Sequence, residues 1–211
     1  MFNRLKNKSE IGKKTSRLRR LFPRLVRSDD GAAALEFALL ALPYFMIIFA
    51  IFETFIAFTG EQIVGGAVDT LARRLRTGQI TATDTTKTTY LSESQFRQAF
   101  CDEIAILMKC SGTEVATPTK LFIDVQSAAS FADISTSIGN DVSTGDVDTS
   151  TFAYAPGGPG TINMVRAVYK WEVMLDLMRP YFSTVKIASD PSKSYFLIME
   201  TTAYKNEPFP E

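Results

Sequence analysis

A long apolar run near the N-terminus is the feature that most constrains how this chain can fold. The run extends from Ala32 to Phe58, and it contains no charged residue between Glu36 and Glu53. As a helix rising about 1.5 Å per residue, its 27 residues would extend about 40 Å, more than the hydrocarbon core of about 30 Å. The run is also longer than the apolar region of a cleaved secretory signal, which has about 7–15 residues. We therefore predict a transmembrane helix over residues 32–58.

The charge of the chain is divided unequally around this run. Residues 1–30 contain ten Lys or Arg and three acidic residues, a net charge of +7, and the other 181 residues contain 13 basic and 20 acidic residues, a net charge of −7. Basic residues beside an apolar span keep that side in the cytoplasm. We therefore predict a basic cytoplasmic leader over residues 1–31 and an extracytoplasmic remainder, in preference to nucleic-acid binding by the basic cluster.

Two acidic residues and a proline interrupt the apolar run. A carboxylate in the hydrocarbon core costs about 2.5–3.5 kcal/mol, so Glu36 either reaches water at the cytoplasmic interface or has a functional partner. Glu53 follows 17 residues later, about 26 Å along a helix, and we expect it to mark the opposite boundary of the membrane. Pro43 removes one backbone hydrogen bond, which predicts a kink, although a simple anchor also tolerates a proline.

The residues around Glu36 resemble the N-terminal segment of TadE-like proteins, the minor pseudopilins of tight-adherence (Flp pilus) systems. The similarity lies in Glu36 five positions beyond Gly31, in the pair Glu36-Phe37, and in Pro43 about two turns later, within the sequence Gly31-Ala32-Ala33-Ala34-Leu35-Glu36-Phe37-Ala38-Leu39-Leu40-Ala41-Leu42-Pro43. A weaker similarity extends through the two cysteines and the ending Lys205-Asn206-Glu207-Pro208-Phe209.

The resemblance implies processing and assembly. A prepilin peptidase would cut after Gly31, so that the mature chain begins at Ala32, and the new amine would pair with Glu36 of the same or a neighbouring subunit. The implied partners are the prepilin peptidase, other minor pseudopilins, the Flp pilin and the inner-membrane pilus assembly platform. The implied location is the bacterial inner membrane, with one span, a cytoplasmic N-terminus, a periplasmic C-terminal domain and association with the pilus. The alternative is a permanently anchored periplasmic scaffold or binding protein that is not processed.

The helix is expected to continue beyond the membrane to about residue 77. Apolar residues recur at helical spacing from Ile63 to Leu75, and Gly78 is well placed to end the helix. Gly65 and Gly66 together weaken it and favour a bend or a close contact with another element. Residues 79–211 then form an extracytoplasmic α+β domain.

A second helix is predicted from Ser92, which with Gln95 forms a capping-box pattern. Cys101 and Cys110, the two cysteines of the chain, follow on the side where disulfides persist, so a bridge is expected. Within one straight helix their Cα atoms would lie about 13 Å apart, beyond the limit of roughly 7 Å. Cys110 must therefore follow the helix end, with a turn at Ser111-Gly112. Two free thiols or a metal pair are the alternatives, although the chain has no histidine to complete a zinc site.

Three strands are predicted, over Leu121–Gln126, Met164–Leu175 and Tyr195–Tyr204. In the longest of them apolar residues alternate with Arg166, Lys170 and Glu172, which is typical of a half-exposed antiparallel strand with Trp171 in the core. The predicted fold class is α+β: a long N-terminal transmembrane helix followed by a small antiparallel-sheet domain with one or two helices, as in pilins.

Residues 133–160 are rich in Ser, Thr, Gly and Asp, which predicts a surface loop that buries little. The acidic and amide residues Asn140, Asp141, Asp146 and Asp148 lack the spacing of an EF-hand, and the Gly-Pro-rich end lacks the Gly-Lys-Ser/Thr of a phosphate loop. Without histidine, the common nucleophile-base and zinc arrangements are excluded. We expect no enzymatic activity, no metal and no cofactor.

Overall fold

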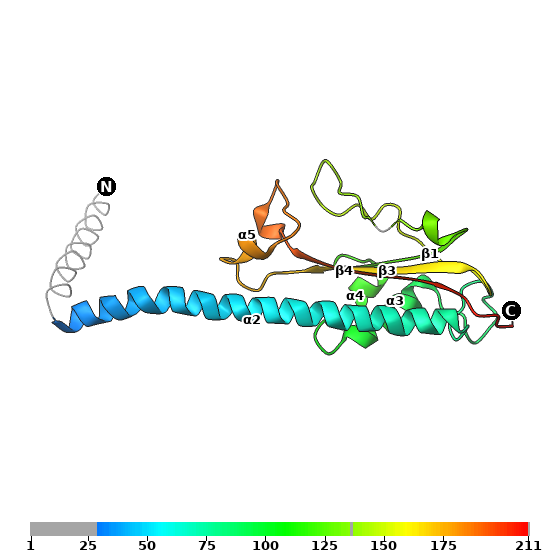
Figure 1. The fold of residues 1–211 in the computed structure, drawn as a ribbon, viewed down its shortest axis with the longest axis horizontal. Coiled ribbons are helices and arrows are strands. Elements are labelled where there is room, and N and C mark those ends of the chain that lie inside the picture. Colours follow the sequence, from blue (N-terminus) through cyan, green and yellow to red (C-terminus); the bar gives the residue numbers. More distant parts are fainter. Residues whose placement is uncertain (1–28, 136, 211) are drawn as a thin grey trace, which may run out of the picture. The chain divides into compact units, whose positions relative to one another are not determined.

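The computed structural model describes residues 29–135 and 137–210, so most of the expected basic leader lies outside the described residues. The chain divides into two compact units between Phe52 and Glu53. The helix α2, Asp29–Arg76, contributes to both units (Figure 1). Its end confirms that the helix continues well beyond the apolar run. The second unit, Glu53–Glu211, is the α+β domain and is called the head below.

The head contains a four-stranded sheet with the order β2-β1-β3-β4. Its strands are β1 (Leu121–Ala128), β2 (Tyr154–Ala155), β3 (Ile162–Trp171) and β4 (Phe196–Lys205). The β1–β3 and β3–β4 pairs are antiparallel, as predicted, but β1 and β2 are parallel, so the sheet is mixed. No sequence pattern predicted β2, because two residues are too few to show the alternation of a strand.

The strand β3 ends earlier than predicted, at Trp171 rather than Leu175. Its neighbours explain the difference: β4 begins with Phe196 opposite Trp171, and β1 begins with Leu121 opposite Tyr169. No neighbouring strand therefore continues beyond Trp171 to pair with the next residues. The apolar alternation persists past the strand because Val173 is buried in the head without being part of the sheet.

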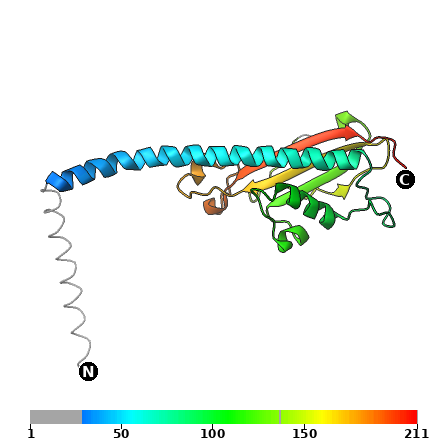
Figure 2. The same cartoon turned by 90° about the horizontal axis from the view of Figure 1, so that it is seen from below.

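One face of the sheet carries the main core and is covered by helices (Figure 2). These are the C-terminal part of α2, α3 (Glu93–Ile104) and α4 (Gly112–Ala116). Of Gly60, Gly65 and Gly66 in α2, Gly60 makes the tightest contact with the sheet, where an added Cβ would lie 3.1 Å from Cδ1 of Ile198. A Cβ at Gly65 would make ordinary contact with Glu200, and one at Gly66 would meet no atom within 4 Å. The close contact expected at the glycine pair therefore occurs one turn earlier.

The opposite face of the sheet is also covered, which corrects two predictions. A second, smaller core forms there from Val147, Val168, Val185, Ile187 and Tyr195. Thus β3 is not half-exposed, and even Arg166 is buried. The segment 133–160 is not purely a surface loop, because a few apolar residues spaced along it, including Val147 and Phe152, pack on this core. The prediction rested on the average composition of the segment, in which these few apolar residues are outnumbered by polar ones.

The predicted helix boundaries hold in the head. Ser92 and Gln95 form the expected capping box at the start of α3. After α2, Gly78 has a φ of 72°, a left-handed conformation that favours glycine and ends the helix. The turn expected at Ser111-Gly112 is instead a helix start, because Ser111 caps α4; the chain reverses before Cys110. Three short helical segments, η1 (Phe131–Asp133), α5 (Arg179–Phe182) and η2 (Pro191–Lys193), lie in the connections.

Candidate membrane anchor and assembly segment

The N-terminal part of α2 presents apolar side chains in every direction. Successive helical residues point about 100° apart, yet Phe37, Leu39 and Leu40 are each more than 70% exposed. Other large apolar side chains of the run are 48–67% exposed: Leu35, Leu42, Tyr44, Phe45, Ile47, Phe49, Ile51, Phe52, Phe55 and Phe58. The most apolar window of the helix has a mean hydropathy of 2.3 and no buried residue. By length and composition, α2 can cross a membrane.

The predicted processing residues lie at the beginning of α2. Gly31 is in its first turn, and Glu36 follows Ala32 by four residues, so these two residues share one helix face. The Glu36 side chain is exposed and makes no hydrogen bond or ion pair with any other described residue. The next residue, Phe37, is 72% exposed. Among the described residues, Glu36 is therefore a carboxylate without a partner at the edge of an apolar surface.

Pro43 lies within α2, and the helix continues on both sides of it. The next two residues pack on each other, with the Tyr44 and Phe45 rings 5.6 Å apart and edge to face. The kink expected at Pro43 stays a prediction.

Glu53 has a role that the sequence did not indicate. It is the first residue of the head and only 4% exposed, so its carboxylate is buried against the head, and its role as a boundary marker stays a prediction. Its Oε1 accepts a hydrogen bond of 3.1 Å from the backbone N–H of Met174. The partner lies 121 residues later, beyond the range of any local sequence pattern.

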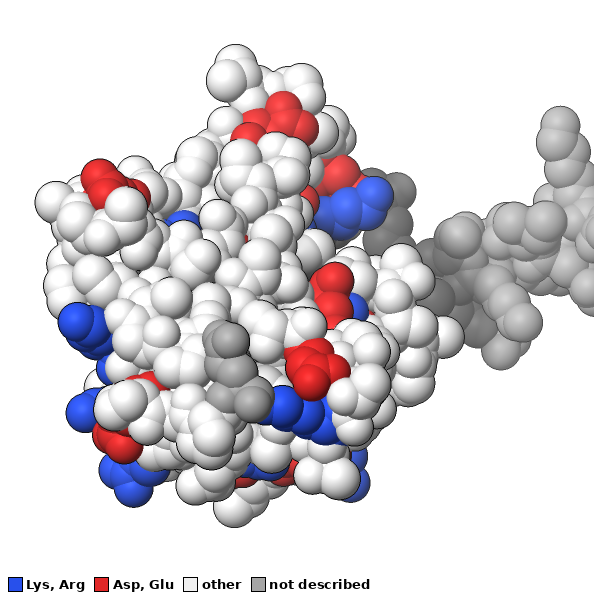
Figure 3. Space-filling model, turned by 90° about the vertical axis from the view of Figure 1, so that its right-hand side faces the viewer, with Lys and Arg blue, Asp and Glu red and all other residues white. Residues whose placement is uncertain are grey.

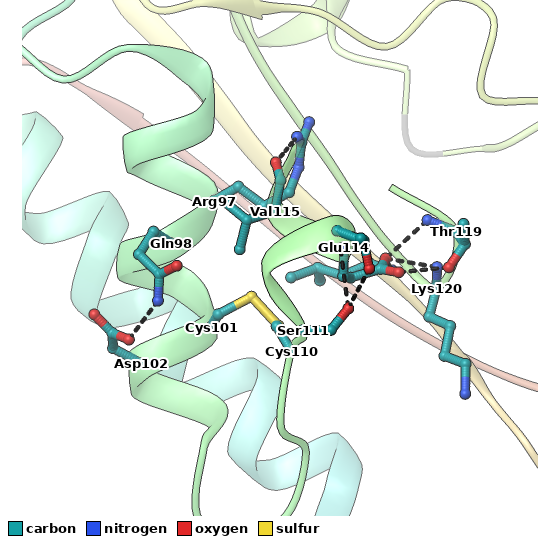
Figure 4. Close-up of a disulfide and its surroundings, with 12 residues drawn as sticks. Arg97, Gln98, Cys101, Asp102, Cys110, Ser111, Glu114, Val115, Thr119 and Lys120 are labelled. Carbon is teal, nitrogen blue, oxygen red and sulfur yellow. Dashed lines mark hydrogen bonds between the residues drawn. A yellow bond between two sulfur atoms is a disulfide. The ribbon is translucent and has the colours of Figure 1, made fainter. Parts of the chain in front are cut away.

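The two cysteines form the predicted disulfide (Figure 4). Their Cα atoms are 5.7 Å apart, and Cys110 lies past the end of α3, as the geometry required. The bridge joins α3 to the segment that leads into α4. Cys101 is buried in the main core, so the bridge fixes this segment to that core.

Glu114 on α4 ties this disulfide region to the sheet (Figure 4). Its Oε1 accepts backbone hydrogen bonds from Thr119, Lys120 and Leu121, at 2.7–2.8 Å. Burial alone would raise the pKa of Glu114, but the hydrogen bonds from Leu121, Thr119 and Lys120 together lower it below its ordinary value. Sequence reasoning missed this residue, although the Ser111-to-Glu114 spacing is that of a capping box and was an available signal.

The last residues of the chain close the end of α2. The backbone N–H of Glu207 donates to the carbonyl of Arg76 at 3.0 Å, and the two side chains form an ion pair of 3.3 Å. The buried Asn206 side chain donates to the carbonyls of Gly157 and Gly158. The ring of Phe209 lies directly over Gly78. The sequence 205–209, noted above only as a weak similarity, therefore has a structural role in the head.

The charged side chains described on the head surface are mixed in sign, and several of them are paired. On the face in Figure 3, basic and acidic side chains are interspersed. In a cleft of about 620 Å³, Lys120 pairs with Glu172 and Lys170 pairs with Asp146. Among residues 29–135 and 137–210 there is no group of three or more side chains placed to hold a metal ion.

These elements define an α+β protein with one long N-terminal helix that can serve as a membrane anchor. Residues 31–73 match the family model of TadE-like proteins, which confirms the resemblance to that family over this segment. The matched segment lies entirely within α2 and contains Gly31, Glu36 and Pro43. No curated protein and no solved structure matches the chain.

Proposed function

We propose that this chain is a TadE-like pseudopilin, a non-enzymatic structural component of tight-adherence pilus biogenesis. Its helix α2 anchors it in the bacterial inner membrane, with the N-terminus in the cytoplasm and the head in the periplasm. A prepilin peptidase matures it after Gly31, and assembly then proceeds through the N-terminal part of α2. The family match over residues 31–73 is the observation that carries this proposal.

The geometry at the start of α2 supports a role for Glu36 after cleavage. Removal of residues 1–31 would create an α-amino group on Ala32, one helical turn before Glu36. Side chains in a helix tilt toward its N-terminus, so the carboxylate leans toward the new positive charge. Opposite charges attract most strongly where water is excluded, which favours such a pair, within one subunit or between two, at the edge of the apolar region.

The exposed apolar surface of α2 supports an environment of lipid or of other helices. A helix that is apolar on all sides requires an apolar surrounding. The Cys101–Cys110 disulfide agrees with a periplasmic head, since disulfides persist in oxidising compartments. The proposed partners are the prepilin peptidase during maturation, other minor pseudopilins and the Flp pilin during assembly, and the inner-membrane assembly platform.

The experiment that tests maturation is the intact mass and N-terminal sequence of the protein purified from membranes. The host carries its own prepilin peptidase, and a peptidase-deleted strain serves as the first control. We expect the wild-type chain to begin at Ala32 and the Gly31→Leu variant to keep residues 1–31. Gly66→Ala is the matched control, because it changes a glycine of the same helix that no other element contacts, and it should be processed normally.

A chain that keeps residues 1–31 in the peptidase-competent host would overturn the pseudopilin mechanism. It would support the permanently anchored periplasmic scaffold instead, because that role requires the helix but no cleavage.

A further inference from the structure

An apolar loop projects from the head after β3. Residues 172–182, which lead into and include α5, expose Met174 (61%), Leu177 (64%) and Tyr181 (80%). Between them Val173 and Met178 are buried and fix the loop to the head. The loop is further braced by Arg179, whose guanidinium donates to the carbonyls of Ser194 and Val173. Three large side chains on a braced loop form an exposed apolar patch, here called the α5 patch, rather than scattered surface residues.

The α5 patch lies at the end of the head where α2 enters it. Glu53, the first head residue, binds the backbone N–H of Met174. A cavity of about 180 Å³ next to this bond is lined both by residues 53–61 of α2 and by Val173 and Phe182. The opposite end of the sheet lies far from it: β1 ends at Ala128 opposite Ile162, the first residue of β3, whereas the patch follows Trp171, the last.

The length of the apolar segment indicates what surrounds this end of the head. From Ala32 to Phe52 there are 21 helical residues, or about 31 Å, which equals the hydrocarbon thickness of about 30 Å. If Ala32 starts at one interface, Phe52 reaches the other and Glu53 comes immediately outside it. The patch, bonded to Glu53, is then held at the depth of the headgroups.

We infer that the α5 patch rests in the interfacial layer of the periplasmic leaflet, with lipid as its ligand. This inference rests on the anchor in the proposed function. Tyr and other amphipathic side chains favour this layer, where an apolar body and a polar tip are both satisfied. The Glu53–Met174 bond, which lies within the head, then keeps the patch beside the residue at which α2 leaves the bilayer.

The charges around the patch suit a shallow position. Asp176 is exposed but forms an ion pair of 2.6 Å with Arg179. Such a pair remains hydrated among headgroups, whereas it would be costly in the hydrocarbon core. The loop is therefore expected to lie at the surface of the bilayer and not to penetrate it.

Single cysteines with an environment-sensitive fluorophore test this placement. Both native cysteines are in the disulfide, so an introduced cysteine is the only free thiol. Leu177→Cys probes the patch, and Phe131→Cys is the matched control, since it is an exposed apolar residue (54%) just beyond β1, at the opposite end of the sheet. Phe45→Cys reports on the anchor. Each full-length variant is reconstituted in phosphatidylglycerol–phosphatidylethanolamine vesicles with and without lipids that carry a nitroxide near the headgroup.

We expect a blue shift and loss of emission at position 177, a similar blue shift at 45, and neither at 131. Emission at 177 that matches 131, while 45 is still blue-shifted, would overturn the inference and leave the anchor intact. An unshifted probe at 45 would mean that the anchor itself fails. Protection of 177 from aqueous iodide without quenching by nitroxide lipid would assign the patch to a second protein copy and would also overturn the inference.

Discussion

At the scale of single residues, Glu114 is the carboxylate whose environment most clearly favours its charged form. Three backbone N–H groups point at one oxygen, and a hydrogen-bonded carboxylate is worth more to stability than the same side chain in water. The lowered pKa means that the folded protein binds a proton less readily than the unfolded chain, whose carboxyl titrates near 4.5. The stabilisation is therefore present above that pH and is lost as the pH falls through the folded pKa.

We predict that Glu114→Gln lowers the free energy of unfolding by about 1–3 kcal/mol at neutral pH, because the amide oxygen is a weaker acceptor and its NH₂ group is left among donors. The difference from wild type should shrink as the pH falls below about 4.5. Denaturant unfolding followed by the fluorescence of Trp171, the single tryptophan of the chain, measures it. Glu103→Gln, an exposed carboxylate on α3, is the control and should change little. A difference that stays constant with pH would contradict this account.

At the scale of elements, the end of α2 depends on a glycine and on the C-terminal tail. Gly78 combines a left-handed φ with the ring of Phe209, whose Cγ would lie 2.5 Å from an added Cβ. Gly78 therefore has two roles: it ends α2, and its lack of a side chain leaves the space that Phe209 fills.

We predict that Gly78→Ala lowers the free energy of unfolding by about 2 kcal/mol or more, since backbone strain of about 1–2 kcal/mol adds to the clash. Gly66→Ala should instead raise it by about 0.5–1 kcal/mol, because alanine favours the helix and meets no neighbour. Both variants are compared by the same unfolding measurement in detergent. Equal effects of the two substitutions would show that the tail does not select glycine at position 78.

The sequence predicted the elements whose pattern is local and missed those that depend on distant partners. The spacing of apolar residues and the capping residues identified α2, α3 and the three longer strands. The distance limit for a disulfide placed Cys110 beyond the helix end. The strand β2 and the second core were not predicted, because β2 forms only by pairing with β1 and the second core forms only by packing on Val168. The same division holds at the candidate site, where the Gly31-to-Glu36 spacing is local and the Glu53–Met174 bond spans 121 residues.

At the scale of the whole molecule, the carboxylates of Glu36 and Glu53, two of the acidic residues of α2, lie in different environments. Glu36 is exposed in the apolar unit and has no partner within the described part of the chain, whereas Glu53 is buried in the head and accepts a backbone hydrogen bond. In the proposed mechanism Glu36 needs its negative charge, because its partner is an amine. Glu53 needs only an acceptor oxygen at the right reach, because its partner is a neutral N–H group.

The same two substitutions at both positions separate these tasks. At Glu53, Gln keeps an acceptor at the same reach and should leave head stability nearly unchanged, whereas Asp is one methylene too short and should cost about 1 kcal/mol by leaving the part-buried Met174 N–H without this acceptor. At Glu36, neither substitution should alter unfolding, but Gln should abolish pilus assembly in the native host, measured as pilin in the sheared surface fraction. If Glu53→Gln destabilised the head as much as Glu53→Asp, the charge would matter there too. If Glu36→Gln cells made normal pili, the amine pairing would have no part in assembly, and α2 would act by its apolar surface alone.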